Sequence, residues 1–361
     1  MSRSVCVIIP SVGNSDELGI VLDGLQSQDY FGPLEVVVVG PSSDPGRKEA
    51  ESRGIRFIDD QGSRTRADAC NVALAATDSE LVMFTDDDVI VPEEWVSRLS
   101  RWFERPEVAG VGGPNFGPPE HSTLQQQVID VSFCSRIFTA GTNYGKRGES
   151  ELQEVEQLPG VNSSYRRSVL KEIGGFPEGS IGAEDVLLDY LIRSAGHRLW
   201  TDRSAVMWHR RRNLSRVRKQ ISNYGLVRTL ASNQHPELRA WSHVMVALFP
   251  PIVIAAFAAF YWGSQNGGLE SPWWDFSLST TELGLGRLGV LALPWLIALY
   301  NVVAWYGSAT GNSPNRNIAT VFLSPIVTFT LHWGYGIGVL RGWWRIFTGN
   351  PGMQIDDRLR E

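Results

Sequence analysis

The chain has 361 residues, of which 43% are hydrophobic, and its formal net charge is −6. A negative net charge provides no global basic field, which argues against nucleic acid as a partner. The three cysteines, Cys6, Cys70 and Cys134, lie far apart, so they predict neither a disulfide framework nor a zinc site and suit a reducing cytosol. The length admits one domain of roughly 200 to 250 residues and a smaller second region.

Residues 1–240 alternate apolar runs with polar stretches, as a soluble α/β domain does. Val5–Ile9 and Leu34–Val39 are short β-branched runs that predict buried parallel strands. Apolar residues at helical spacing predict a helix over Asp16–Gln28 between them. A second helix over Thr65–Ala76 and a third strand over Leu81–Thr85 favour a doubly wound open sheet, whose ligand crevice lies beyond the carboxyl ends of its strands.

Three adjacent carboxylates, Asp86, Asp87 and Asp88, follow the third predicted strand. The outer two could reach a Mg²⁺ or Mn²⁺ ion, because such hard cations prefer oxygen ligands. The ion would bridge diphosphate oxygens and neutralise charge on a departing nucleotide. The alternative is a solvated acidic turn or a helix N-terminus. Because three neighbouring carboxylates repel one another, we favour the cation.

A second acidic pair, Glu184 and Asp185, opens a predicted amphipathic helix. Taken alone, the pair fits the ordinary preference for acidic residues at a helix N-terminus. A carboxylate at the mouth of the same crevice would, however, be placed to take a proton from a substrate hydroxyl.

Beyond residue 240 the sequence carries three long apolar segments, Val244–Trp262, Leu288–Tyr306 and Ile318–Leu340. Each is near the ~20 residues that a helix needs to cross a bilayer, and Trp and Tyr gather at their ends. A buried helical subdomain is the alternative, and the prolines in each segment predict kinks or interruptions. We therefore predict two regions, a catalytic domain over 1–240 and a membrane region over 241–361.

Charge predicts the orientation of this region. The arginine-rich stretch His209–Arg239 precedes the first span and is expected in the cytosol, whereas the acidic loop around Glu270 suits the outside. Three full spans would then place Arg341 and Arg345 outside, against the positive-inside rule. Either one segment is re-entrant or interfacial, or these basic residues are overruled. A basic, partly apolar helix over Asn213–Ser232 is predicted to lie on the cytosolic membrane surface.

Several motifs occur in order over roughly residues 4–232, namely VCVIIPS, LQSQDY, LEVVVVGPSSD, RADACN, FTDDD, GVNSSYRRSVLKEIGGF, GAEDVLLDYLIRSAG and MWHRRR. In this order they resemble glycosyltransferase family 2, the inverting enzymes with a GT-A type fold. With the membrane region and the segment QISNYGLVRT, the chain looks most like the exopolysaccharide (succinoglycan-type) glucosyltransferase branch or related archaeal surface-glycan enzymes. The resemblance implies an open, mostly parallel sheet with helices on both faces, followed by transmembrane helices.

The resemblance also implies a donor site. Pro10 and Ser11 match the loop that touches the nucleotide, and Arg66 matches a basic position that contacts nucleotide or phosphate. The family often reads the nucleobase with an aspartate after the second strand. Gly40 and Pro41 stand there in this chain, which leaves Ser42 or Asp44 as substitutes.

Asp86 and Asp88 match the outer positions of the DxD motif, within a donor-binding run that includes Asp87. We expect Asp88 to ligate the metal and Asp86 to lie nearer the ribose or a metal-bound water, while Asp87 is the replaceable one. His209 matches a histidine that in some GT-A enzymes completes the metal or diphosphate site; a satisfied structural histidine is the alternative.

Arg212, within Arg210–Arg212, is expected to hold diphosphate or lipid headgroups, unless these arginines only set the topology. On the acceptor side, Asp185 matches the aspartate that acts as general base, with Glu184 as second choice. Asn162 is expected to bind the acceptor beside them.

The predicted enzyme is metal-dependent and moves one sugar from a nucleotide-diphosphate donor to a polyprenyl-linked saccharide, with its catalytic domain on the cytosolic side of the cell membrane. Single addition is favoured because Gln220–Tyr224 lacks the Arg-Trp pair of the processive synthases. The alternatives are a polyprenyl-phosphate sugar synthase and a catalytically inactive membrane scaffold. The polar segment Gly141–Gln157 is predicted to be a surface loop, or a lid over the acceptor.

Overall fold

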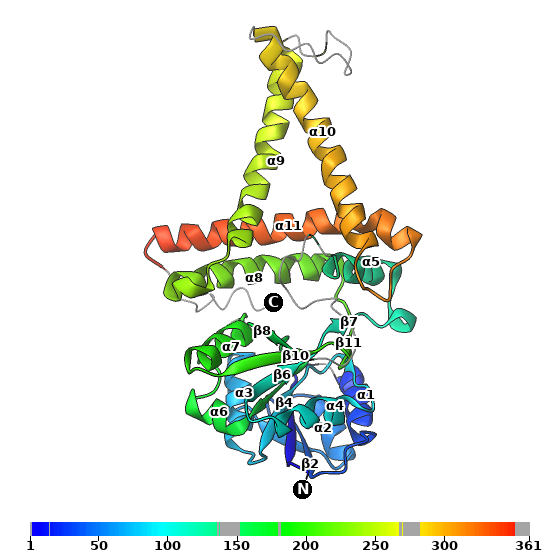
Figure 1. The fold of residues 1–361 in the computed structure, drawn as a ribbon, viewed down its shortest axis with the longest axis vertical. Coiled ribbons are helices and arrows are strands. Elements are labelled where there is room, and N and C mark those ends of the chain that lie inside the picture. The colour runs from blue at the N-terminus through cyan, green and yellow to red at the C-terminus, as the bar shows by residue number, and fades with distance from the viewer. Residues whose placement is uncertain are drawn as a thin grey trace.

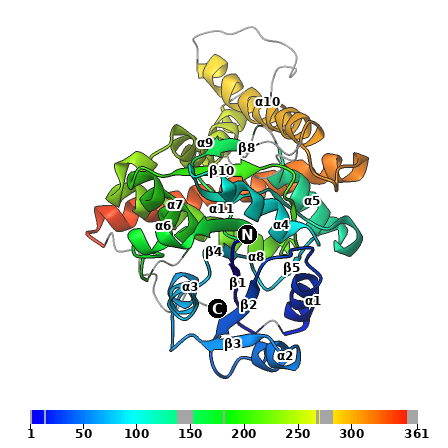
Figure 2. The same ribbon diagram turned by 60° about the horizontal axis from the view of Figure 1, so that its bottom comes forward.

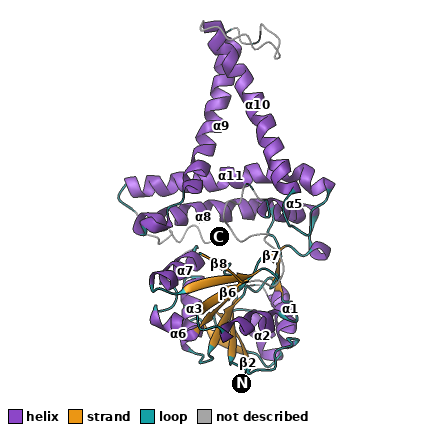
Figure 3. Cartoon of the chain, viewed as in Figure 1, coloured by secondary structure: helices purple, strands orange, loops and turns teal. Residues whose placement is uncertain are grey.

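The computed structural model describes residues 2–13, 15–135, 137, 152–179, 182–266, 269 and 282–350 (Figure 1). Strands gather in one half of the molecule, and the other half is helical (Figure 3). A layer of α5, α8 and α11 lies next to the strand-bearing half, and the hairpin of α9 and α10 extends from the far side of that layer (Figure 1).

The larger sheet has eight strands in the order β3-β2-β1-β4-β9-β6-β10-β8. Four adjacent strands, β3-β2-β1-β4, are parallel and form the predicted open sheet. β6 and β10 also pair in parallel, whereas β9 and the edge strand β8 run antiparallel to their neighbours. The strands are β1 (Val5–Pro10), β2 (Leu34–Gly40), β3 (Arg56–Asp59), β4 (Leu81–Phe84), β6 (Val108–Gly112), β8 (Leu152–Val155), β9 (Ser163–Arg166) and β10 (Arg198–Asp202).

Alternating side chains of the central strands face two hydrophobic cores. Val5, Val7 and Ile9 pack with α1 and α4, whereas Cys6 and Ile8 pack with α3, α6 and α7. Figure 2 shows these helices on opposite sides of the sheet. The period of two in β1 thus explains why helices cover both faces. The helices are α1 (Ser15–Gln26), α2 (Gly46–Ser52), α3 (Arg66–Ala75), α4 (Trp95–Ser100), α5 (Leu124–Phe133), α6 (Arg167–Glu172) and α7 (Glu184–Ser194).

The predicted strands and helices of the catalytic half are confirmed within one or two residues. Thr65 caps α3, its side-chain oxygen accepting a 3.1 Å hydrogen bond from the N–H of Asp68. The predicted loop Gly141–Gln157 is wrong at its end, because residues 152–155 form β8 and pair with β10. Residues 141–151 lie outside the described part of the chain.

A second, three-stranded sheet has the order β5-β11-β7 and joins three distant segments. In it, β11 (Met207–His209) pairs antiparallel with β5 (Val89–Ile90) and parallel with β7 (Asn115–Phe116). His209 lies opposite Val89, the residue after Asp88. This small sheet therefore brings His209 to the acidic cluster.

The helical half consists of α8 (Leu214–Gln234), α9 (Trp241–Gln265), α10 (Glu282–Ala309) and α11 (Ile318–Phe347). The three predicted apolar helices exist and run longer than predicted, continuing through their prolines. By length and composition alone, Trp241–Gln265, Arg287–Ala309 and Ile318–Phe347 could each cross a membrane.

The three apolar helices nevertheless differ in direction. α9 and α10 pack against each other as a hairpin, whereas α11 lies across their base and alongside α8 (Figure 1). Glycines permit this close packing: a Cβ at Gly338 would lie 2.0 Å from the carbonyl oxygen of Ser222. α8 occupies its predicted range, but α11 covers it on the side from which the hairpin extends, so α8 itself does not form that outer surface.

The outer face of α11 carries a stripe of exposed apolar side chains at helical spacing. Its members are Ile318, Phe322, Ile326, Phe329, Trp344 and Phe347. The opposite face is buried and rich in small residues, among them Ser324 and Gly338. α11 is therefore an amphipathic helix with an apolar face pointing away from α8.

Candidate active site

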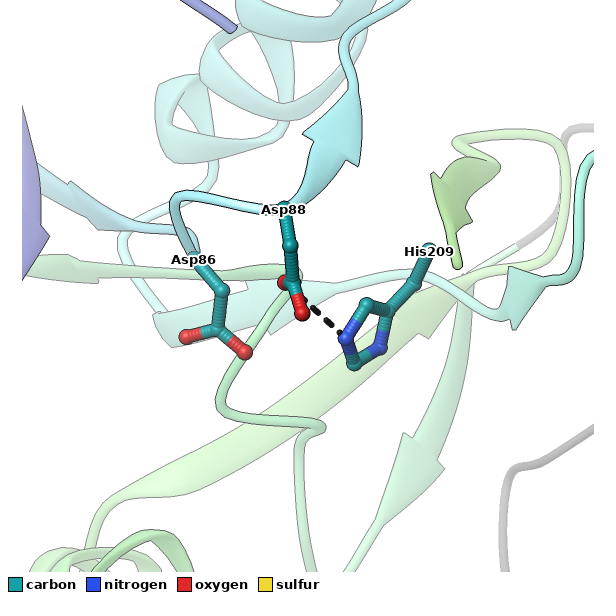
Figure 4. Close-up of side chains that lie close together, drawn as sticks. All are labelled: Asp86, Asp88 and His209. Carbon is teal, nitrogen blue, oxygen red and sulfur yellow. Dashed lines mark ion pairs between the residues drawn. The ribbon is translucent and has the colours of Figure 1, made fainter. Parts of the chain in front are cut away.

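Asp86, Asp88 and His209 form a compact group at the carboxyl end of β4 (Figure 4). One oxygen or nitrogen from each lies within 4.8 Å of the others. Two carboxylate oxygens and an imidazole nitrogen are a donor set that suits Mn²⁺, and Mg²⁺ would rely more on the carboxylates. The predicted residues are thus brought together, and β11 supplies the third from more than a hundred residues away.

Asp88 has a buried oxygen on the side of this group. Its Oδ1 atom lies 3.1 Å from Nε2 of His209 as an ion pair, and it accepts no hydrogen bond of full geometry from the described residues. A buried carboxylate oxygen whose only support is an ion pair can still take a cationic ligand. Burial opposes ionisation of Asp88, yet the neighbouring His209 and Arg212 hold its pKa below the ordinary value. The carboxylate is therefore kept ionised, as a metal ligand must be.

Arg66 contacts both acidic sites, the Asp86–Asp88 group and the Glu184–Asp185 pair. From the first turn of α3, its Nη2 donates a 2.9 Å hydrogen bond to Asp86 and a 3.1 Å hydrogen bond to the carbonyl of Gly160. Its Nη1 lies 3.5 Å from the Glu184 carboxylate. One guanidinium thus fixes the spacing between the metal group and the start of α7, the second acidic site.

Glu184 and Asp185 occupy the first turn of α7. Asp185 accepts hydrogen bonds from the N–H groups of Val186, at 2.8 Å, and Gly160, at 3.4 Å. Burial raises the pKa of Asp185, and the Val186 N–H, Arg66, the Gly160 N–H and Arg228 oppose the rise. Burial raises the pKa of Glu184 too, with Arg66 opposing it. A half-buried carboxyl with a raised pKa is suited to proton transfer.

The loops after β1 and β2 form the side of the site predicted to hold the nucleotide. Ser11 is buried and donates a 2.7 Å hydrogen bond to the Asp87 carboxylate. Asp44 accepts hydrogen bonds from the N–H groups of Gly13, at 2.6 Å, and Gly46, at 2.7 Å. A Cβ at Gly40 would lie only 2.3 Å from the Ser11 carbonyl oxygen, so no side chain fits there. Pro10 is half-buried and Ser42 is exposed.

Asn162 does not face the two acidic pairs. It is fully buried, and its amide bonds the indole N–H of Trp95 and the carbonyls of Pro114 and Ala205. This burial weighs against its predicted contact with an acceptor. Its bonds instead tie β9 and its preceding loop to neighbouring segments.

The three consecutive arginines after β11 have different surroundings. Arg210 lies 2.8 Å from Glu17 of α1, and Arg211 is buried against Asp130 of α5. Arg212 is exposed and close enough to Asp88 to lower its pKa. Of the three, only Arg212 keeps a position open to an anionic ligand, and the burial of Arg211 rules out its predicted contact with diphosphate or headgroups in this arrangement.

Residues 6–174 match the profile of the family described as Glycosyl transferase family 2. This matched segment is just under half of the chain, and it resembles that family in sequence. Asp86 and Asp88 lie within the matched segment, whereas the Glu184–Asp185 pair and His209 lie after it. The expected resemblance and the GT-A type fold are confirmed.

Three proteins are similar to this chain over part of its sequence. The O-antigen chain rhamnosyltransferase RfbN of Salmonella typhimurium is 24% identical over 57% of this chain and 66% of its own length. The Pre-mycofactocin glycosyltransferase of Mycobacterium tuberculosis is 27% identical over 81% and 56%. The Succinoglycan biosynthesis protein ExoA of Rhizobium meliloti is 23% identical over 72% and 79%. The chain thus spans 56–66% of the first two relatives.

A solved structure shares the fold over nearly the whole chain. Mannosyltransferase PcManGT from Pyrobaculum calidifontis, determined with GDP-Man and Mn²⁺, aligns with a TM-score of 0.55 and 20% identity. The alignment covers 95% of this chain and 88% of the mannosyltransferase. The fold of the glycosyltransferase, including its helical half, therefore has a counterpart in a known structure.

Proposed function

We propose that this glycosyltransferase transfers one sugar, with inversion, from a nucleotide-diphosphate donor to a lipid-linked saccharide. The observation that carries the proposal is the Arg66 bridge. It holds the three residues that could ligate a metal next to a carboxyl pair with raised pKa. A metal-assisted leaving group and a general base are the two functions that direct displacement requires.

Asp88, Asp86 and His209 would hold a Mg²⁺ or Mn²⁺ ion, which when bound would neutralise charge on the departing diphosphate. Asp185 takes the proton from the acceptor hydroxyl. At the same time the hydroxyl oxygen forms a bond to the anomeric carbon of the donor sugar, and the bond between that carbon and the nucleotide diphosphate breaks. Glu184, held by Arg66, is the alternative base. Arg66 and Arg212 face the diphosphate, while the loops that contain Pro10, Ser11, Ser42 and Asp87 line the nucleotide side.

Metal-dependent transfer from a radiolabelled sugar nucleotide into membrane lipid tests this function. A screen of UDP-, GDP- and dTDP-sugars with Mn²⁺ by thermal shift identifies the donor first, because a ligand of the native state raises apparent stability. Mn²⁺ is the first metal to try, since the similar mannosyltransferase was solved with it. Full transfer in the presence of a chelator would contradict the metal role. Analysis of the lipid product separates a lengthened saccharide from a sugar on a single polyprenyl phosphate.

We further propose that only α9 and α10 span the membrane and that α11 lies in its cytosolic interface. A 25-residue helix such as α9 is about 37 Å long, enough to cross a ~30 Å hydrocarbon core. The apolar stripe of α11 faces away from α8 on the hairpin's side, as an interfacial helix requires. Two spans return the chain to its starting side, which keeps Arg341 and Arg345 cytosolic and removes the conflict with the positive-inside rule.

Cysteine labelling in sealed vesicles of known orientation tests this topology. An Arg341→Cys variant, made in a background in which the native cysteines are replaced by serine or alanine, should react with an impermeant maleimide from the cytosolic side. An Arg210→Cys variant on the catalytic half is the matched control for that side. Labelling of position 341 from the opposite side only would restore three spans.

A further inference from the structure

Five buried polar residues connect the catalytic half to the loop between α10 and α11. We call this group the Asp130 cluster, and its members are Asn115, Asp130, Arg211, Ser313 and Asn315. Each is at most 6% exposed. They come from β7, α5, the segment after β11 and the loop after α10, so four distant parts of the chain meet at one carboxylate.

The hydrogen bonds of the Asp130 carboxylate divide between the two halves of the molecule. Its Oδ1 accepts bonds from Nε of Arg211, at 2.8 Å, and the N–H of Gly117, at 2.7 Å. Its Oδ2 accepts bonds from the hydroxyl of Ser313, at 2.6 Å, and the amide of Asn315, at 3.0 Å. Without the loop, Oδ2 would lose both of these donors while remaining inside the protein, which is costly for a charged group.

The Asp130 cluster also fixes the strand that carries His209. Arg211 lies two residues after His209, and its Nη1 and Nη2 donate to the side chain and backbone of Asn115, at 2.9 and 3.1 Å. Asn115 pairs with Met207 in the small sheet, where His209 in turn lies opposite Val89. The guanidinium thus clamps the end of β11 next to the metal group.

We propose that Ser313 and Asn315 are positioning residues for the metal site: by completing the Asp130 cluster they hold β11 so that His209 stays beside Asp86 and Asp88. Metal affinity then depends on a loop that only the membrane hairpin delivers. This inference rests on the proposed metal-dependent function. It adds that the membrane region is a part of the active site's scaffold as well as an anchor.

The test is Mn²⁺ binding by full-length protein in detergent, measured by calorimetry or by electron paramagnetic resonance of the free ion. The Ser313→Ala/Asn315→Ala double variant removes both donors to Oδ2, and we expect its Mn²⁺ affinity to fall about 10-fold or more, the scale seen when outer-shell support of a metal is lost. Each single variant leaves one donor to Oδ2 of Asp130. If the double variant fails to fold, the Mn²⁺ affinity of the single variants provides the test.

Ser308→Ala is the matched control. Ser308 is also a buried serine of this region, five residues before Ser313, but its hydroxyl makes no hydrogen bond within the described residues. We expect Mn²⁺ affinity to be unchanged in this variant and restored in Ser313→Thr, which keeps a hydroxyl. A purely structural role would lower the Tm of the cluster variants while leaving Mn²⁺ affinity of the folded protein at the wild-type value, and that result would overturn the inference. Absence of Mn²⁺ binding by the wild-type chain would overturn the proposed function instead, and this inference with it.

Discussion

Two aspartates at either side of β11 show how differently the same side chain is used. Asp88 lies beside His209, and its buried Oδ1 makes an ion pair with it but accepts no hydrogen bond of full geometry from the described residues. Asp130 lies beside Arg211, two residues further along, and each of its oxygens accepts at least two hydrogen bonds. The unsatisfied carboxylate marks a place for a ligand, whereas the satisfied one holds the chain together. The number of hydrogen bonds that each carboxylate accepts therefore distinguishes the candidate ligand, Asp88, from the structural residue, Asp130.

The largest effect on catalysis is expected from Asp185→Asn. It removes the proposed base while preserving size and most hydrogen bonds, so kcat should fall by roughly 10²- to 10⁴-fold with little change in Tm. Asp189→Asn is the contrasting variant. Asp189 is fully buried and bonds the N–H of Leu158 and the hydroxyl of Tyr165, so its loss should lower Tm first. Full activity in Asp185→Asn would remove Asp185 from the mechanism and favour Glu184 as the base or an inactive scaffold.

A pair of variants, Asp88→Ala and Asp130→Asn, tests directly whether Asp88 binds a ligand while Asp130 stabilises the fold. Asp88→Ala should lower transfer on the order of 10²-fold and abolish the rise in Tm on adding Mn²⁺, with the metal-free protein as stable as wild type. Asp130→Asn leaves the buried Arg211 without its charge partner and should lower the free energy of unfolding by about 3–5 kcal/mol. The transfer assay measures the loss of activity. Chemical denaturation in detergent, with and without Mn²⁺, measures the stability of both variants. Equal destabilisation by the two variants would erase the distinction.

The acid limb of the pH–rate profile should report Asp185. Its pKa is raised in the fold, and a base acts only when deprotonated, so activity should rise with pH through a midpoint above that of an ordinary aspartate. Arg228 opposes the rise. Arg228→Gln should therefore move the midpoint to higher pH, by less than about one unit. A midpoint that moves to lower pH in this variant would contradict the assignment.

The smallest effect is expected on the nucleotide side, where Ser11 donates to Asp87. Either Ser11→Ala or Asp87→Ala should raise the KM for the donor a few-fold, because the net contribution of one hydrogen bond within the protein is about 0.5–1.5 kcal/mol. The double variant should be little worse than either single one, since both remove the same bond. Additive losses would show that the two residues act on the donor independently.

Local patterns predicted most of the catalytic half. Apolar runs and helical spacing predicted β1, β2, β4, α1 and α3. The sequence alone also placed Asp86 and Asp88 directly after a predicted buried strand. The resemblance of the motif around His209 predicted a place for it near the acidic cluster, and the pairing of β11 with β5 brings the residue there. These features depend on neighbours in sequence or on an ordered motif set.

The remaining features depend on pairings that no local pattern records. Asp130 and Ser313 are 183 positions apart, and nothing near either one indicates the other. β8 is a short polar edge strand with partly exposed side chains, so it carries no apolar signal. Average hydropathy made α11 resemble α9 and α10; its apolar residues at spacings of three and four, opposite small ones, were the signal for an amphipathic helix.

The Asp130 cluster also has a consequence for folding during synthesis, because its residues are made at different times. Asp130 and Arg211 leave the ribosome well before Ser313 and Asn315, which follow about 100 residues later and therefore roughly 5 to 20 s later at ordinary rates of synthesis. During that interval the carboxylate has only the donors of its own half. With the proposed two-span topology, the Asp130 cluster is completed only after the hairpin has been inserted and the loop after α10 has been made, so completion of the site would coincide with arrival at the membrane.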